Sequence, residues 1–228
     1  MLEKRAIADE LMDAEDLDPK IYAQVLTDLA KVNRIVMATR PTLDFLARAI
    51  GDARSFSVLD VGYGDGDMLR AIARWAKKRG IEARLTGIDL NPQSEHVARA
   101  ATPSDLAIVY RTGDYADLSS EPFDFILSSL VAHHMTQDQL IAFLAFMAKH
   151  AKRGWLINDL HRHAFAYVGY PLLATLMRWH PIVRHDGRLS IARSYRPDEW
   201  PLLLREAQVK GARIFRSFPF RLCVEQIR

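Results

Sequence analysis

Cysteine is almost absent from this chain of 228 residues, occurring only at Cys223. A single thiol cannot form a disulfide within the chain, and low cysteine content is typical of proteins in a reducing compartment. The charged N-terminal residues contain no apolar signal segment. We therefore expect a cytoplasmic protein whose fold depends on its hydrophobic core, for which the chain is long enough.

Long apolar runs are also missing. No uninterrupted run reaches the ~18–20 residues that are needed to span a bilayer. The most apolar candidate, residues 164–177, is too short and contains Pro171. The sequence therefore predicts no membrane span, and residues 164–177 are better explained as a buried covering element.

Two common nucleotide-binding signatures do not occur. The chain has no Gly-Lys-Ser/Thr phosphate loop, and no tyrosine is followed four residues later by lysine, the acid/base pair of short-chain reductases. The glycine spacing also differs from the G-x-G-x-x-G pattern of dinucleotide-binding dehydrogenases. These absences argue against phosphate-loop nucleotidases and nicotinamide-dependent reductases.

A strand, a glycine-rich turn and a helix are predicted around residues 58–75. The apolar run that starts at Val58 ends at Asp60-Val61, glycines follow at alternate positions, and a helical apolar period begins at Met68. A second apolar run ends at Asp89, where nucleotide-binding α/β folds carry the acid that binds a ribose. We therefore expect a nucleoside-bearing cofactor at the carboxyl edge of a parallel sheet.

Four motifs resemble those of class I S-adenosylmethionine (SAM)-dependent methyltransferases. They occur in the family's order within residues 55–160, as Asp60-Val61-Gly62-Tyr63-Gly64-Asp65-Gly66, Gly87-Ile88-Asp89-Leu90-Asn91-Pro92, Gly113-Asp114-Tyr115 and Phe123-Asp124-Phe125-Ile126-Leu127-Ser128-Ser129. The resemblance implies an α/β, Rossmann-like fold with a mainly parallel seven-stranded sheet and helices on both faces. One departure is Tyr63, where the family more often has a small residue or cysteine.

The resemblance also implies a division of the chain and a substrate class. We expect one methyltransferase domain, residues 1–228, comprising an N-terminal helical cap (1–50), a SAM-binding core (55–160), a helical insertion on the substrate side (161–196), and a C-terminal helix and strand pair (197–228). The segments Asn158-Asp159-Leu160-His161-Arg162, Asp186-Gly187 and Leu189-Ser190 look like small-molecule methyltransferases of polyketide or quinone pathways. His185-Asp186 either touches a polar substrate group or forms a turn before Gly187.

Cofactor contacts follow from the same resemblance, with SAM as cofactor and S-adenosylhomocysteine as product. The glycines should shape the loop beneath the methionine part, Asp60 should order that loop or meet the amino group, and Asp89 should hold the ribose. The remaining candidates are Leu90 and Tyr115 beside the adenine, Asp114 at its exocyclic amine, Ser128 or Ser129 near the methionine, and Asn33, Arg34 or Arg40 at its carboxylate. Core packing is the alternative for Leu90 and Tyr115, as a helix surface is for Arg40.

Histidines supply the candidate bases, because an imidazole titrates near neutral pH. His161, after the fifth predicted strand, is the first candidate and His134 the second, while one member of the His133-His134 pair has a scaffold role. Asp159 either orients a neighbouring group or caps a helix. Magnesium-dependent catechol methyltransferases have carboxylate ligands that this chain does not match, so we expect no metal.

The expected reaction is methyl transfer to a small hydrophobic or aromatic acceptor. Oxygen methylation of a phenol or polyketide-like secondary metabolite is the first hypothesis, and carbon or nitrogen methylation of a quinone-like or other small molecule is the alternative. An RNA or protein methyltransferase is less favoured, although residues 151–228 contain 14 Lys/Arg against 6 Asp/Glu. A SAM-binding module without transfer is a third hypothesis. We expect no nucleic-acid partner, and a homodimer is possible.

Overall fold

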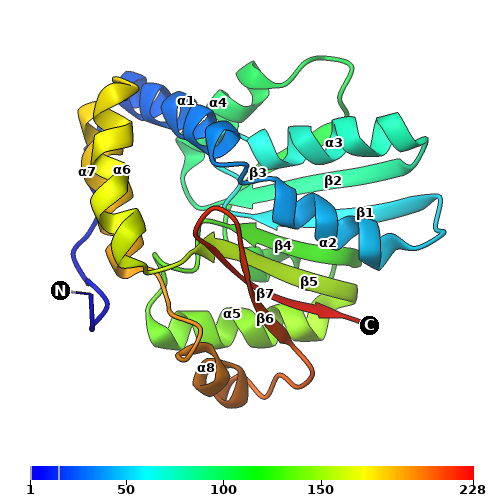
Figure 1. Ribbon diagram of the computed structural model, residues 1–228. Helices are drawn as coiled ribbons and strands as arrows, with labels where there is room; N and C mark the ends of the chain where they lie inside the picture. Colours follow the sequence, from blue (N-terminus) through cyan, green and yellow to red (C-terminus); the bar gives the residue numbers. More distant parts are fainter. Residues whose placement is uncertain (1, 15) are drawn as a thin grey trace.

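One sheet of seven strands runs through the molecule in the order β3-β2-β1-β4-β5-β7-β6 (Figure 1). The computed structural model describes residues 2–14 and 16–228. Strands β1 to β5 are parallel to one another, whereas β7 is antiparallel to both β5 and β6. The expected seven strands are present, and the sheet is mixed because its last two strands form an antiparallel hairpin. The strands are β1 (Ser55–Val61), β2 (Glu82–Asp89), β3 (Ile108–Thr112), β4 (Phe123–Ser129), β5 (Ala151–Leu160), β6 (Arg213–Ser217) and β7 (Arg221–Ile227).

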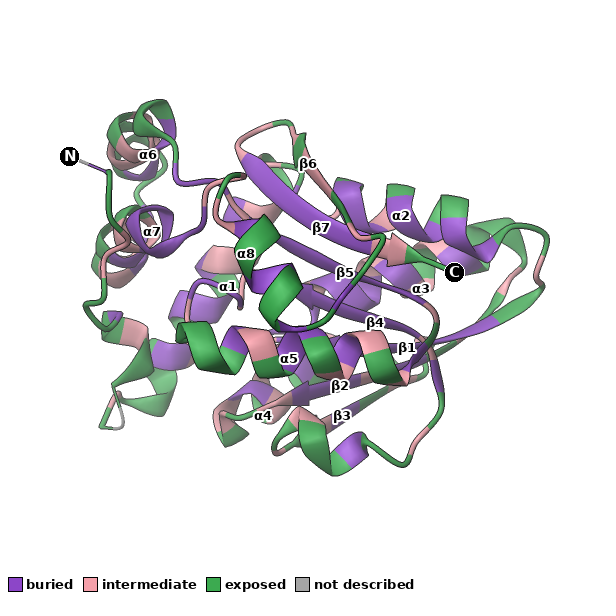
Figure 2. Cartoon of the chain, turned by 90° about the horizontal axis from the view of Figure 1, so that it is seen from below, coloured by how far each residue is buried: buried purple, intermediate pink, exposed green. Residues whose placement is uncertain are grey.

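Helices cover both faces of the sheet, and each face has its own apolar core. On one face Leu69 and Ile72 are fully buried, and on the other face Phe143 and Leu144 are. Figure 2 looks onto α5, whose outward side is exposed, with buried strands behind it. The first face carries α2 (Arg40–Ile50), α3 (Asp67–Arg79) and α4 (Pro92–Ala101), and the second carries η2 (Tyr115–Leu118), α5 (Gln137–His150) and α8 (Trp200–Glu206).

Three further helices pack on one another beside the carboxyl ends of the parallel strands (Figure 1). They are α1 (Pro19–Ile35), α6 (Ala164–Leu176) and α7 (Pro181–Arg193), with contacts between α6 and α7 and between α1 and α7. Val25, Trp179 and Val183 are buried between these helices. The N-terminal helices and the insertion after β5 therefore close over the same edge of the sheet.

The start of α1 follows directly from its sequence. The Asp18 carboxylate accepts a hydrogen bond from the Lys20 N–H at 2.7 Å, and Pro19 occupies the first helical turn. A capping aspartate satisfies an N–H that has no partner within the helix, and proline has no N–H to satisfy. These two residues fix where the helix begins, and hence where its apolar face meets α7.

The predicted insertion is helical, and at His185-Asp186 it does not form the turn that was one of the two alternatives for these residues. Asp186 and Gly187 both lie inside α7. A β-carbon at Gly187 would lie 2.2 Å from the ring of Tyr170 in α6, so glycine allows α6 and α7 to approach closely. This glycine therefore marks helix packing, which the sequence alone cannot distinguish from a turn.

No helix in the described part of the chain is both long enough and apolar enough to cross a membrane. The apolar segment at residues 164–177 corresponds mainly to α6, and its side chains are not all buried. Phe165, Leu172 and Leu176 are exposed, so this segment is only in part the buried element that the sequence predicts.

Candidate active site

The loop between β1 and α3 lies close to neighbouring segments because of its glycines. Gly62 has a φ of +74° and Gly66 a φ of +80°, a region that side chains disfavour. A β-carbon at Gly62 would lie 2.4 Å from the Val131 side chain, and one at Gly66 would lie 2.4 Å from the Tyr110 hydroxyl. At Gly64 the nearest atom, in Leu26, is 3.6 Å away. Space is thus limiting at Gly62 and Gly66, whereas Gly64 is constrained mainly by its φ of +54°.

Tyr63, the unusual residue of this loop, is buried in the core. Its ring centroid lies 4.9 Å from that of Tyr110. A β-carbon at Gly87 in β2 would lie 2.6 Å from the Tyr63 ring. Gly87 therefore provides the room that the bulky Tyr63 side chain needs.

Three carboxylates from different elements converge beside this loop. The pKa of Asp60 is raised well above its usual value by burial and by the charges of Asp67 and Asp89, and its Oδ1 has no hydrogen-bond partner within residues 2–14 and 16–228. Burial and the charge of Asp65 raise the pKa of Asp67 to about 6. Burial also raises the pKa of Asp89, although the N–H groups of Gly64 and Asn91 donate to it at 3.0 and 2.9 Å. Such a cluster favours a cationic ligand.

The expected adenine-side residues lie at the carboxyl ends of β2 and β3. Leu90, Asp114 and Tyr115 all line the same cavity as Asp60 and Asp89. Leu90 is 74% exposed, so its side chain is available for contact with a ligand. The Asp114 carboxylate accepts from the Ala116 N–H at 2.8 Å, and the Tyr115 ring packs 4.8 Å from the ring of Phe143.

Two expected cofactor residues lie outside the cavity wall. Ser128 is buried and donates its hydroxyl hydrogen bond to the Val61 carbonyl at 3.2 Å, whereas its neighbour Ser129 lines the cavity. Arg40 is exposed at the start of α2 and forms an ion pair with Asp44 at 3.8 Å. Because successive strand residues point to opposite faces, only one serine of the pair can face the cavity.

A different arginine lines the cavity. Arg221, the first residue of β7, is 1% exposed, and burial lowers the pKa of its guanidinium group. Its Nε and Nη1 have no hydrogen-bond partner in the part of the chain that the structure describes. A buried, unpaired cation is costly, so Arg221 is suited to bind an anionic group that enters the cavity.

The cavity has a volume of about 870 Å³ and continues beyond the carboxylates into an apolar chamber. This chamber is formed by helices α1, α6 and α7 together with the loop that follows β4. Its size is typical of a site for a small molecule and cofactor. The apolar residues of the chamber include Val25, Leu29, Val32, Val36, Leu173, Val183 and Ile191.

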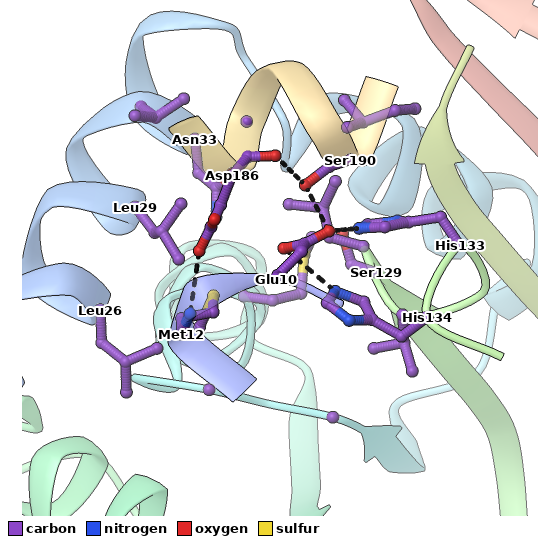
Figure 3. Close-up of a pocket in the computed structure, with 18 of the residues that line it drawn as sticks. Glu10, Met12, Leu26, Leu29, Asn33, Ser129, His133, His134, Asp186 and Ser190 are labelled. Carbon is purple, nitrogen blue, oxygen red and sulfur yellow. Dashed lines mark hydrogen bonds and ion pairs between the residues drawn. The ribbon is translucent and has the colours of Figure 1, made fainter. Parts of the chain in front are cut away.

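Histidines and carboxylates lie on one side of this chamber (Figure 3). The Nδ1 of His133 lies 2.7 Å from the Asp159 carboxylate, which also accepts from the His133 N–H at 2.8 Å. Burial would raise the pKa of Asp159, but the interactions with His133 outweigh it, so the pKa is lowered. The Nδ1 of His134 lies 3.0 Å from Asp13. Asp159 therefore orients His133, and is not a helix cap.

The pKa values of His134 and His161 are shifted in opposite directions, although both residues line the cavity. Burial alone would lower the pKa of His134, but the hydrogen bond to Asp13 and the charge of Glu10 outweigh it, so the pKa is raised. Burial and the nearby charge of His163 lower the pKa of His161. These shifts favour the neutral form of His161, the form that a general base requires, and the charged form of His134.

Comparison with known proteins agrees with this geometry. Residues 58–154 match the family model described as a methyltransferase domain. A ubiquinone biosynthesis O-methyltransferase from Alkalilimnicola ehrlichii is 28% identical over 175 residues, which cover 73% of this chain and 66% of the relative, just under two thirds of its length. These matches support a class I SAM-dependent methyltransferase, with residues 58–154 as its methyltransferase domain.

Solved structures show the same fold. A plantazolicin methyltransferase, BpumL, in complex with a monoazolic desmethylPZN analog and SAH has a TM-score of 0.61 and 16% identity, covering 92% of this chain and 96% of that one. The human N-acetylserotonin methyltransferase in complex with SAM has a TM-score of 0.64 and 15% identity, covering 98% of this chain and 60% of that one.

Sequence reasoning missed two residues of the candidate site, Glu10 and Arg221. Glu10 lies beside the two histidines in the cavity wall, although more than a hundred residues separate it from them. The segment around Glu10 contains no motif. Only the burial of this acid in a polar N-terminal stretch distinguishes it, and burial is not visible in the sequence. Arg221 was missed for a similar reason, because nothing in a terminal strand indicates which way an arginine points.

Proposed function

We propose that this methyltransferase binds SAM along the loop after β1 and transfers its methyl group to an oxygen of a small aromatic acceptor. The observation that carries the proposal is one continuous cavity, lined by carboxylates at one end and by apolar side chains and histidines at the other. A cationic cofactor suits the first part, and a flat hydrophobic acceptor suits the second.

The cofactor assignment is supported by buried groups without partners. The Oδ1 of Asp60 is suited to the ammonium group of the methionine part, and Asp89 is suited to the ribose hydroxyls. Arg221, which replaces our expectation for Arg40, is suited to the methionine carboxylate. When bound, SAM supplies an electrophilic methyl group on a positively charged sulfur.

The acceptor assignment is supported by the apolar chamber and by the curated relative. That relative is named as an O-methyltransferase of ubiquinone biosynthesis, and this name supports transfer to an oxygen atom. The chamber has few charged groups beyond the histidine side, so it favours a neutral ring system over a nucleic acid or a peptide. A role in secondary metabolism and a cytoplasmic location remain predictions.

The reaction depends on alignment of the acceptor oxygen, the methyl group and the sulfur more than on covalent catalysis by the protein. The acceptor O–H bond breaks as its proton passes to a base, the oxygen lone pair forms the new C–O bond, and the C–S bonding pair remains on sulfur. The products are a methyl ether, S-adenosylhomocysteine and a proton held by the enzyme. His161, His134 and the Asp159-oriented His133 are the candidate bases, and the apolar chamber excludes water.

Calorimetric titration tests the cofactor. We expect the wild-type protein to bind SAM but not NADH, and Asp89→Ala to bind SAM about 10- to 100-fold more weakly, because two hydrogen bonds to a charged acceptor are lost. Asp198→Ala, at an exposed site, is the matched control and should bind like wild type. An absence of SAM binding by the wild-type protein would contradict the proposal. With binding established, phenols and quinols are the acceptors to screen for methyl transfer.

A further inference from the structure

Three side chains from two distant parts of the chain converge in the wall of the cavity (Figure 3). Glu10 comes from the segment before the short helix η1 (Leu11–Asp13), and His133 and His134 come from the loop after β4. One ligand-type atom from each lies within 4.8 Å of the others. Glu10 is 4% exposed and His133 is 2% exposed, so the cluster is not a solvated surface patch.

The distances between these groups are too long for direct hydrogen bonds. The Nε2 of His133 lies 3.7 Å from Glu10 Oε1, and the Nε2 of His134 lies 3.8 Å from Glu10 Oε2. Hydrogen bonds of this kind are about 2.7–3.2 Å long. Two atoms that each lie about 2.0–2.2 Å from one metal ion can be up to about 4.4 Å apart. The spacing therefore suits an ion that lies between the carboxylate and the imidazoles.

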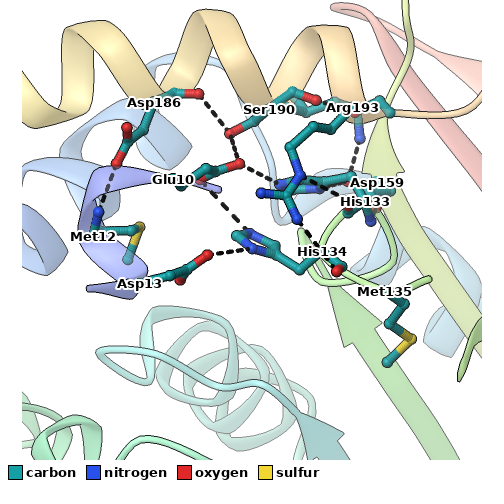
Figure 4. A network of polar contacts seen from close by, with 12 residues as sticks. Glu10, Met12, Asp13, His133, His134, Met135, Asp159, Asp186, Ser190 and Arg193 are labelled. Carbon is teal, nitrogen blue, oxygen red and sulfur yellow. Dashed lines mark hydrogen bonds and ion pairs between the residues drawn. The ribbon is translucent and has the colours of Figure 1, made fainter. Parts of the chain in front are cut away.

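The outer nitrogens of both rings are held by carboxylates (Figure 4). His133 Nδ1 is bound to Asp159 at 2.7 Å, and His134 Nδ1 to Asp13 at 3.0 Å. Histidines that bind metals commonly donate their other N–H to a carboxylate, which fixes the tautomer and the ring orientation. Here both Nε2 atoms are directed toward Glu10, so two imidazole lone pairs and one carboxylate point at a common place.

Helix α7 contacts both of the segments that carry the three groups. From α7, Asp186 accepts from the N–H groups of Leu11 and Met12 at 3.0 and 2.9 Å. The Ser190 hydroxyl donates to Glu10 Oε1 at 2.8 Å, and Arg193 donates to the carbonyls of His133 and His134, each at 3.3 Å (Figure 4). These contacts from α7 thus hold the cluster in place before any ion binds, as metal-binding sites require.

We propose that Glu10, His133 and His134 bind a divalent transition-metal ion, with its open positions facing the acceptor chamber. Two imidazoles and one carboxylate are a ligand set for ions such as Zn²⁺, Co²⁺ and Fe²⁺, and not for Mg²⁺ or Ca²⁺, which prefer oxygen ligands. Its place in the reaction rests on the proposed function. With His133 and His134 as ligands, His161 would remain as the base. An acceptor hydroxyl bound to the ion would pass its proton to that base more readily and would be held for attack on the methyl group.

Cobalt binding tests the site without any need for activity. Tag-free protein is treated with a chelator, dialysed and titrated with Co²⁺, while visible absorption and calorimetry are recorded. We expect one equivalent to bind with absorption bands of a low-coordinate site. Glu10→Gln and His134→Asn should each weaken binding at least about tenfold. His96→Asn and Glu82→Gln, at exposed positions, are matched controls that should bind like wild type.

Two results would overturn the proposal. One is a wild-type protein that binds no stoichiometric Co²⁺, and the other is a Glu10→Gln variant that binds it with wild-type affinity and absorption. Glutamine retains an oxygen for the Ser190 hydroxyl, so this variant should fold, and circular dichroism checks that it does. Either result would mean that the cluster is held by carboxylate–imidazole contacts alone.

The metal proposal and the proposed function can fail separately. SAM affinity is measured before and after chelation, because no cofactor-binding residue belongs to the cluster. Loss of methyl transfer after chelation, restored by added Zn²⁺ or Co²⁺ at unchanged SAM affinity, supports the metal site. Methyl transfer that is unaffected by chelation overturns the metal's role and leaves the methyltransferase assignment intact.

Discussion

At the scale of single residues, the role that we propose for Arg221 rests on its burial and not on its position in a motif. The sequence indicated Arg40 because the N-terminal helices of the family cover the cofactor, yet Arg40 is exposed and pairs with Asp44. Arg221 instead is 1% exposed in the cavity wall, without a partner for its Nε and Nη1 among the described residues. Whether an arginine faces a ligand depends on strand register and neighbouring side chains, which sequence patterns do not specify.

Replacing Arg221 by methionine should lower the affinity for SAM without lowering the free energy of unfolding. We expect Arg221→Met to weaken SAM binding about 10- to 100-fold, since a charge-assisted pair with the methionine carboxylate is lost. The free energy of unfolding of the cofactor-free protein should be unchanged or higher, because an unpaired buried charge is replaced by an apolar side chain of similar length. Calorimetry and urea unfolding measure the two quantities. Arg40→Met, the exposed control, should change neither, and wild-type SAM affinity in Arg221→Met would refute the assignment.

At the scale of elements, the glycine loop, the strands and a helical insertion after the fifth strand were predictable, whereas the contacts that the insertion makes were not. Short apolar runs ending at Asp60 and Asp89 specify β1 and β2, because parallel strands are buried on both faces and their carboxyl ends meet at one edge. In the insertion, α7 carries Asp186 and Gly187, whose residue types also suit a turn. The role of α7 depends on its contacts with the segment from Leu11 to Asp13. Contacts between residues so far apart in the chain leave no local pattern in the sequence.

Asp186→Asn tests the attachment of that segment. An amide oxygen can accept hydrogen bonds at only one of the two positions, so at least one of the N–H groups of Leu11 and Met12 loses a charged acceptor. We expect faster hydrogen exchange in residues 5–13 and a loss of about 1–3 kcal/mol in unfolding free energy. Mass-spectrometric exchange measures the first effect and urea unfolding the second. Asp198→Asn is the exposed control, and unchanged protection of residues 5–13 would show that α7 does not hold them.

At the scale of the whole molecule, the fold places like charges together where several elements meet. The carboxylates come from β1, β2 and the start of α3, and they share the cavity with Arg221 of β7. The groups that face Asp67 are Asp65, Asp60, Arg70, Asn33 and Arg221. Concentrating acids in this way lowers the stability of the cofactor-free protein and favours a cation, so ligand binding and protonation are coupled.

This coupling predicts a pH dependence with a definite sign. The pKa of Asp67 is about 6 in the folded protein against a usual value of 3.8. The folded state therefore keeps a proton that the unfolded state releases, so this contribution to stability is present at low pH and is lost as pH rises through 6. A shift of this size corresponds to about 3 kcal/mol at most. SAM, as a cation, should bind more tightly as Asp67 ionises over the same range.

Asp67→Asn isolates this effect from the other titrating groups. Histidines such as His161, whose pKa is lowered, contribute a stability change of opposite sign that is common to both proteins. As pH is raised from about 4 to about 7, urea unfolding should therefore show that the wild-type protein loses stability relative to Asp67→Asn. Calorimetry should show that SAM affinity rises less with pH in the variant than in the wild type. Parallel stability curves for the two proteins would mean that Asp67 titrates normally, because a group with equal pKa in both states cannot change the difference.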